Sequence, residues 1–107
     1  MKTITWDTNF NGKLGCDRFA HIDLAPATMP TRRQMEETII NIQVADKSHS
    51  PVVVRLDAII PLRLQELSNL HTWPSHGMYT EDFVHWLHRR QPIKDDTRLA
   101  VYYYKKS

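Results

Sequence analysis

Three polar side chains near the N-terminus have the types and the spacing that acid–base chemistry needs. Lys13 follows Gly12 in a turn-forming stretch, where a lysine can reach a phosphate while backbone N–H groups approach it closely. His21 and Asp23 are two residues apart, so on a strand they project from the same face. A carboxylate beside a histidine can fix the imidazole tautomer and raise its basicity. The stretch therefore predicts a catalytic group of these three side chains, with Arg18 available to bind an anion.

Further candidate residues lie on two later strands. Arg55 and Asp57 share one face of an apolar stretch, where they either line the same groove or form an ordinary surface ion pair. Tyr102 and Tyr104 share a face of the last predicted strand, and exposed tyrosines can stack on nucleic-acid bases. Tyr103 faces the other way, and we expect it to pack in the core.

The cysteine and histidines do not form a recognisable metal site. His85 and His88 are three residues apart on a predicted helix, with His71 and His76 upstream, but no cysteine pair or ligand signature accompanies them. Cys16 has no third group that would orient it with a histidine as a nucleophile, so we expect a small apolar filler. The sequence therefore predicts no metal and no cofactor.

The candidate side chains depend on strands for their positions. Five segments alternate with the strand period of two: residues 1–6, 19–24, 38–44, 52–60 and 98–104. The fourth is so rich in β-branched residues that a helix is disfavoured. It follows the third after a short polar loop, and this arrangement predicts an antiparallel hairpin.

Two short helices are predicted between the fourth and fifth strands. Pro61 and leucines at every third position predict a helix over residues 62–70, followed by a loop over residues 73–77. Thr80 as N-cap, an acidic first turn and a basic last turn predict a second helix over residues 80–90. Both helices fall in one insertion, which argues against βαβ crossovers. We therefore predict one mostly β (α+β) domain over residues 1–107: a small antiparallel β-barrel of about five strands with two inserted helices.

The composition restricts the cellular setting. Apolar residues make up 41% and charged residues 24%, as in ordinary soluble globular proteins. No apolar run is long enough for a membrane-spanning helix, and the first residues lack the apolar core of a secretory signal. A single cysteine fits a reducing compartment, so we expect a cytoplasmic protein without a membrane partner. The net charge of +2 permits a nucleic-acid partner without indicating one.

The order of these elements resembles the ASCH domains of the PUA-like superfamily, especially short bacterial or phage-like members. The resemblance is carried by residues 10–13, 16–19 and 22, by residues 52–59 and 64–67, and by residues 77–83, 86–87 and 99–104. It implies a PUA-like β-barrel that binds RNA, or a hydrolase acting on RNA or modified nucleosides, with a lysine after the glycine in the site. Asp23 stands where the family usually has arginine, and Ala20 and His21 replace threonines.

The sequence leaves three functions open. The first is a small RNA- or nucleotide-binding module that uses a groove beside residues 12–23, and its predicted binding residues are Gly12, Lys13, Arg18, Arg55 and Tyr102. Such a module would bind through phosphate contacts that weaken with salt.

The second function is a hydrolase of the amidohydrolase or ribonuclease type. Lys13 would bind an anion or activate a nucleophile, and His21, Glu36 or Glu37 would act as the base.

The third is a non-catalytic accessory protein that acts through a protein interface or as a homodimer. Three aromatic residues are the candidate interface anchors: Trp6, Trp73 and Tyr104. Whether the chain is an enzyme is undecided at this level.

Overall fold

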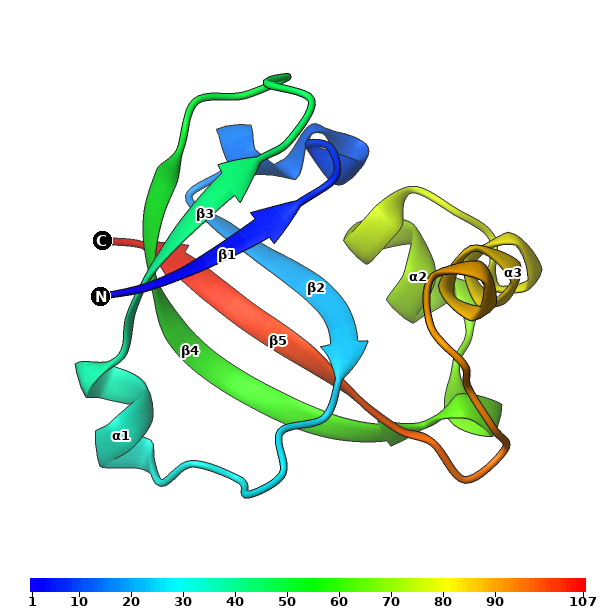
Figure 1. Cartoon of the computed structure of the whole chain (residues 1–107). Helices are drawn as coiled ribbons and strands as arrows, with labels where there is room; N and C mark the ends of the chain where they lie inside the picture. Colours follow the sequence, from blue (N-terminus) through cyan, green and yellow to red (C-terminus); the bar gives the residue numbers. More distant parts are fainter.

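The computed structural model describes residues 1–107 as a mixed α+β domain built on one five-stranded sheet (Figure 1). The elements are, in order, β1 (Lys2–Trp6), η1 (Phe10–Gly15), β2 (Arg18–Leu24), α1 (Arg32–Glu37), β3 (Ile39–Val44), β4 (Val52–Arg63), η2 (Leu64–Glu66), α2 (Asn69–His76), α3 (Thr80–Arg90) and β5 (Arg98–Lys106). The five predicted strands are confirmed, and η1 and η2 are short 3₁₀ helices. No helix is both long enough and apolar enough to cross a membrane.

The strands are ordered β1-β3-β4-β5-β2 in the sheet. The predicted β3–β4 hairpin is confirmed as antiparallel, as are the β4–β5 and β5–β2 pairs, whereas β1 and β3 run parallel. β1 and β2 are the two edges, and no hydrogen-bonded pair joins them. The sheet is therefore open in its hydrogen bonding.

Side chains nevertheless connect the two edges of the sheet. The Trp6 ring of β1 stacks on the His21 ring of β2 at 4.0 Å between centroids, and it meets the Phe19 ring edge-on at 5.9 Å. β4 has an irregular register between Leu56 and Ala58, and such a bulge increases local twist and bends a strand. Figure 1 shows the curled sheet, and the contact of Trp6 with His21 places its edge strands β1 and β2 near each other.

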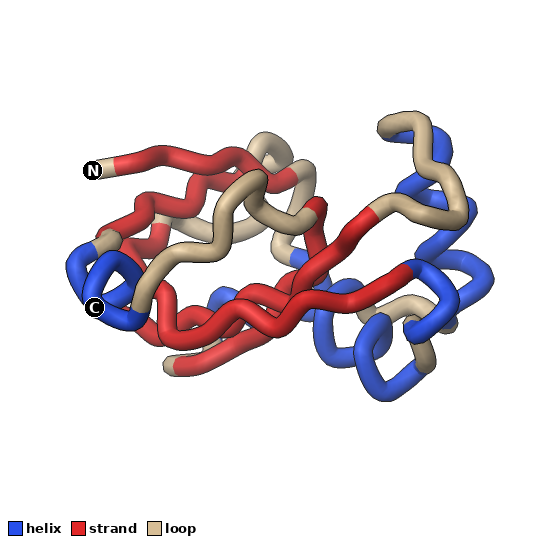
Figure 2. Tube along the Cα trace, turned by 90° about the horizontal axis from the view of Figure 1, so that it is seen from below, coloured by secondary structure: helices blue, strands red, loops and turns tan.

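The core has two parts. Eleven buried residues fill the curl of the sheet, including Phe10 and Leu14 from η1, and six more lie between the sheet and α3. Phe83 and Leu87 provide the buried stripe of α3. In Figure 2 the α2–α3 pair lies at one end of the sheet, and α2 packs against β2 and η1.

The predicted helix over residues 62–70 is wrong. Leu62 continues β4, where it is buried opposite Leu99, and this packing outweighs the three-residue leucine repeat. The helix instead begins at Asn69 and occupies the predicted loop over residues 73–77, ending at Gly77 with φ +65°. Helix α3 has the predicted bounds, although Tyr79 rather than Thr80 is its N-cap.

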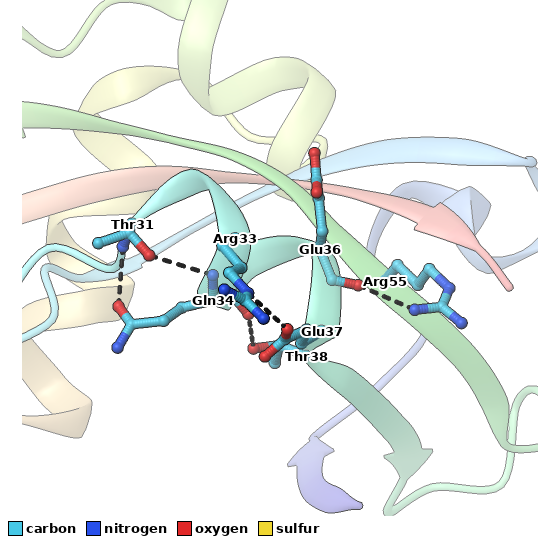
Figure 3. A network of polar contacts seen from close by, with 7 residues as sticks. All are labelled: Thr31, Arg33, Gln34, Glu36, Glu37, Thr38 and Arg55. Atoms are coloured by element: carbon cyan, nitrogen blue, oxygen red, sulfur yellow. Dashed lines mark hydrogen bonds and ion pairs between the residues drawn. The ribbon is translucent and has the colours of Figure 1, made fainter.

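Helix α1 was not predicted, and a local motif explains it. Thr31 Oγ1 accepts a hydrogen bond from Gln34 N at 3.2 Å, and Gln34 Oε1 accepts one from Thr31 N at 2.8 Å, which forms a capping box. At the other end, Arg55 Nη1 of β4 donates to Glu36 O at 2.9 Å (Figure 3). Arg55 thus ties a C-terminal carbonyl of α1 to the sheet.

Candidate functional site

Lys13 points into the protein. Asn11 and Gly12 have φ values of 58° and 65°, and these two left-handed residues turn the backbone of η1 before the lysine. Its side chain is only 4% exposed. The ammonium Nζ donates to Ala20 O at 2.8 Å and to Ser75 O, and it lies 2.6 Å from His21 Nδ1. The predicted turn lysine is therefore a buried group that connects η1, β2 and α2.

Opposing effects act on the charge of Lys13. The two carbonyl oxygens and the C-terminal end of α2 favour the ammonium form, as does the Trp6 ring, which lies 4.7 Å from Nζ. Burial removes water from the charge and lowers the pKa of Lys13 from 10.5 to about 7. Near neutral pH both the ammonium and the free amine are therefore populated.

His21 is the partner of Lys13 and is 6% exposed. Burial, followed by the charges of Lys13 and His76, keeps the pKa of His21 well below its usual value, so the ring is neutral. Its Nδ1 is engaged by Lys13, whereas Nε2 has no partner in the protein and is not sealed from solvent. Lys13, and not Asp23 as the sequence suggested, therefore sets the tautomer. Asp23 Oδ1 accepts from Leu24 N at 2.8 Å.

Ser75 and His76 belong to the same cluster, although the sequence gave them no role in catalysis. Ser75 Oγ accepts a hydrogen bond from Ile22 N at 2.7 Å and lies 2.6 Å from His76 Nδ1. The buried hydroxyl hydrogen has no other acceptor in reach, so it points at Nδ1 and leaves the histidine proton on Nε2. Burial, with smaller effects of Lys13 and Arg90, lowers the pKa of His76 to about 3. The sequence predicted a loop over residues 73–77, and no sequence pattern indicated that Ser75 and His76 would pair.

A cavity of about 170 Å³ lies between the two sheet edges and α3. Its lining residues are Thr5, Trp6, Asp7, Phe10, His21, Ile22, Asp23, Trp86, Leu87, Arg90 and Gln91. Arg90 forms an ion pair with Asp7, and its guanidinium lies 5.0 Å from the Trp86 ring centroid. The cavity therefore combines aromatic walls with charged groups, and His21 connects it to the buried lysine.

A second hollow of about 430 Å³ runs along the same seam and shares Thr5, Trp6 and Asp23 with the first. Tyr102 and Tyr104 line it, and Tyr102 donates its hydroxyl hydrogen to Leu24 O at 2.6 Å. This contact stabilises the free edge of β2.

The predicted exposure of two tyrosines is reversed. Tyr104 is buried opposite Phe19 and Leu56, whereas Tyr103 is 41% exposed. The residues that share the face of Tyr103, Leu99 and Val101, are buried in the cluster beneath α3, which does not extend to Tyr103.

The other predicted site residues do not reach the cavity. Arg18 is exposed and lies 3.8 Å from Asp57, and Arg55 holds α1. Glu36 and Glu37 are on the exposed side of α1, paired with arginines of the same helix.

Three remaining predictions concern exposure and metal binding. Trp6, proposed as an exposed interface anchor, is buried because it packs between the sheet edges, whereas Trp73 is half-exposed. Cys16 is exposed, contrary to the expected apolar filler. No group of three or more His, Cys, Asp or Glu side chains is placed to hold a metal ion.

No family model, curated protein or solved structure matches the chain. The contacts and the cavity of the site are therefore the basis for inferring its function.

Proposed function

We propose that the chain is a hydrolase that activates water for attack on an amide or ester carbonyl of a small molecule held in the 170 Å³ cavity. The observation that carries this proposal is the 2.6 Å contact between Lys13 Nζ and His21 Nδ1. It joins a buried amine with a pKa of about 7 to a histidine whose side chain lines the cavity. A base with this pKa is well matched to catalysis at neutral pH.

The pair acts as a proton relay. When Lys13 is neutral, its lone pair accepts from His21 Nδ1–H, and His21 Nε2 is free to accept a proton from water. As the water oxygen bonds to the carbonyl carbon, its proton moves to Nε2 and the Nδ1 proton moves to Lys13. The imidazolium, which burial and the neighbouring ammonium disfavour, is never formed. Reversing the relay returns a proton to the leaving group as its bond to the carbonyl carbon breaks.

The cavity suggests the size of the substrate. Aromatic walls from Trp6, Phe10 and Trp86 favour a flat group, and the volume suits a single ring system. The base of a modified nucleoside, the substrate class implied by the resemblance to ASCH domains, falls within this description. We further propose that the curled sheet is a PUA-like barrel whose β1–β2 seam is closed by packing of Trp6 on Phe19 and His21.

Hydrolysis of p-nitrophenyl acetate and p-nitroacetanilide tests the proposal. Loss of a positioned general base lowers rates by about 10²–10⁴-fold, so His21→Gln and Lys13→Met should each lower kcat/KM by that order. Lys94→Met, which removes an exposed lysine away from the cavity, is the matched control and should behave as wild type. The proposal is refuted if the wild type does not exceed buffer with either compound, or if His21→Gln retains wild-type rates.

A second candidate, the RNA-binding module, is favoured by a different surface. Arg18, Lys105 and Arg55 are in register on the neighbouring strands β2, β5 and β4, so their side chains share one face of the sheet. Asp57 pairs with Arg18, which leaves an excess of positive charge in this row. Filter binding of single-stranded RNA at low salt should weaken in Lys105→Gln, and binding no stronger than background would exclude this function.

A further inference from the structure

His76 holds the single buried side-chain nitrogen or oxygen without a hydrogen-bond partner, its Nε2. The residue is 4% exposed. Four rings surround it at 4.5–4.9 Å between centroids: Phe10, His21, Phe83 and Trp86. Three of these rings, all but Phe83, also line the 170 Å³ cavity. His76 is therefore separated from the cavity by one layer of side chains.

The protonation of this ring is fixed from the other side. Ser75 Oγ, itself held by Ile22 N–H at 2.7 Å, donates to His76 Nδ1, so Nε2 carries a hydrogen. A buried N–H without an acceptor destabilises a fold. The arrangement is unfavourable for the empty protein and favourable for one that binds a hydrogen-bond acceptor.

Trp86 is the least buried residue of the dividing layer. His21 is held by Lys13, and Phe10 is buried in the main core. Trp86 is only partly buried, and its indole N–H makes no hydrogen bond within the protein. Outside the core its ring is covered by the Arg90 guanidinium. A rotation of this one side chain would open the cavity toward His76.

We propose that His76 Nε2–H donates a hydrogen bond to the carbonyl oxygen of a planar amide or ester ligand, which reaches it when the Trp86 ring moves aside. This inference rests on the proposed function and adds to it the group that binds the carbonyl oxygen. His21 Nε2 would take the proton from water, while His76 would bind the oxygen on which negative charge develops. The two imidazole centroids are 4.5 Å apart, so the two histidines are neighbours that one ligand could contact. The ligand class is therefore a flat molecule with an exposed carbonyl oxygen.

Benzamide, a planar ring with one carboxamide, is a suitable probe. In ¹H–¹⁵N NMR of the full chain, benzamide should shift the His76 Nε2–H resonance downfield and change the Trp86 indole signal. His76→Phe removes the donor and should weaken benzamide binding by about tenfold or more. His76→Gln keeps a donor and should retain most of the affinity. His85→Gln, on the exposed side of α3, is the matched control.

The results separate this inference from the proposed function. If benzamide moves the His76 signal but neither chromogenic compound is hydrolysed, the hydrolase proposal fails and the His76 contact stands. If benzamide does not bind to the wild type, binds without moving that signal, or binds equally well to His76→Phe, the inference is overturned. Should His76→Phe not fold, the His76 resonance in wild type and the affinity of His76→Gln for benzamide decide the question. A loss of affinity of about tenfold or more in His76→Gln would also overturn the inference.

Discussion

Replacing Lys13 by methionine tests the electrostatics of the buried amine. Methionine has a similar length and no charge, so the site keeps its volume. Because burial lowers the pKa of Lys13 from 10.5 to about 7, the unfolded chain binds more protons than the folded chain between these two values. Folding stability should therefore rise with pH across this window, and the rise should be absent from the variant.

The size of the effect follows from the two pKa values. One pKa unit corresponds to about 1.4 kcal/mol, and linkage then gives a gain of about 2 kcal/mol in the free energy of unfolding between pH 7 and pH 9. The variant also leaves Ala20 O, Ser75 O and His21 Nδ1 without their hydrogen-bond partner. That loss lowers stability at every pH by about 1–3 kcal/mol per group. The loss of stability that is the same at every pH and the change of stability with pH can therefore be measured separately.

Urea unfolding followed by tryptophan fluorescence at pH 7, 8 and 9 measures both. The stability difference between wild type and Lys13→Met should widen by about 2 kcal/mol from pH 7 to pH 9. Titration of other groups cancels in this difference, and His21 titrates below the window. Lys94→Met should follow the wild type in parallel. If the Lys13→Met curve is also parallel to wild type, the amine has an ordinary pKa and the relay loses its basis.

Three further outcomes are expected. The rate of ester hydrolysis should rise about tenfold per pH unit below pH 7 and level off above it, because the relay needs neutral Lys13. A flat pH–rate profile in steady-state kinetics from pH 5.5 to 9 would contradict this expectation. The pKa of His76 is lowered from 6.5 to about 3, so stability is lost as pH falls through this range; urea unfolding should show His76→Phe losing about 2 kcal/mol less than wild type between pH 6.5 and 4.5. Asp7→Asn should change stability by less than about 1 kcal/mol, because its ion pair with Arg90 is half-exposed; a loss well above that value in urea unfolding would mean that the pair is desolvated.

Local patterns in the sequence were sufficient to locate the strands of the sheet. Alternation of apolar side chains located all five strands, the β3–β4 hairpin followed from a short polar loop, and the charge order of residues 80–90 gave the bounds of α3. The positive φ of Gly12 was also foreseeable, because glycine alone adopts it without strain. Each of these features depends on neighbours within a few residues.

The candidate site depended on contacts that no local pattern describes. The sequence singled out Lys13 and His21, and the fold brings them together, but it also buries both and supplies Ser75 from a position 62 residues further on. That residue lies on α2, which formed where a loop was predicted, whereas packing of Leu62 opposite Leu99 extended β4 into the region of the predicted helix. Desolvation, and with it the lowered pKa of Lys13, is a property of the assembled interior.

The chain near Gly12 thus shows what each level determines. Residue types alone set the candidates for acid–base chemistry and the strand that carries His21. Only the tertiary structure decided that the lysine points inward and that it, rather than Asp23, orients the histidine. It also decided that His76 is buried behind the side chains that line the cavity. The physical reason is that face alternation fixes which side chains share a side of a strand, whereas curling of the sheet and docking of α2 fix which side water can reach.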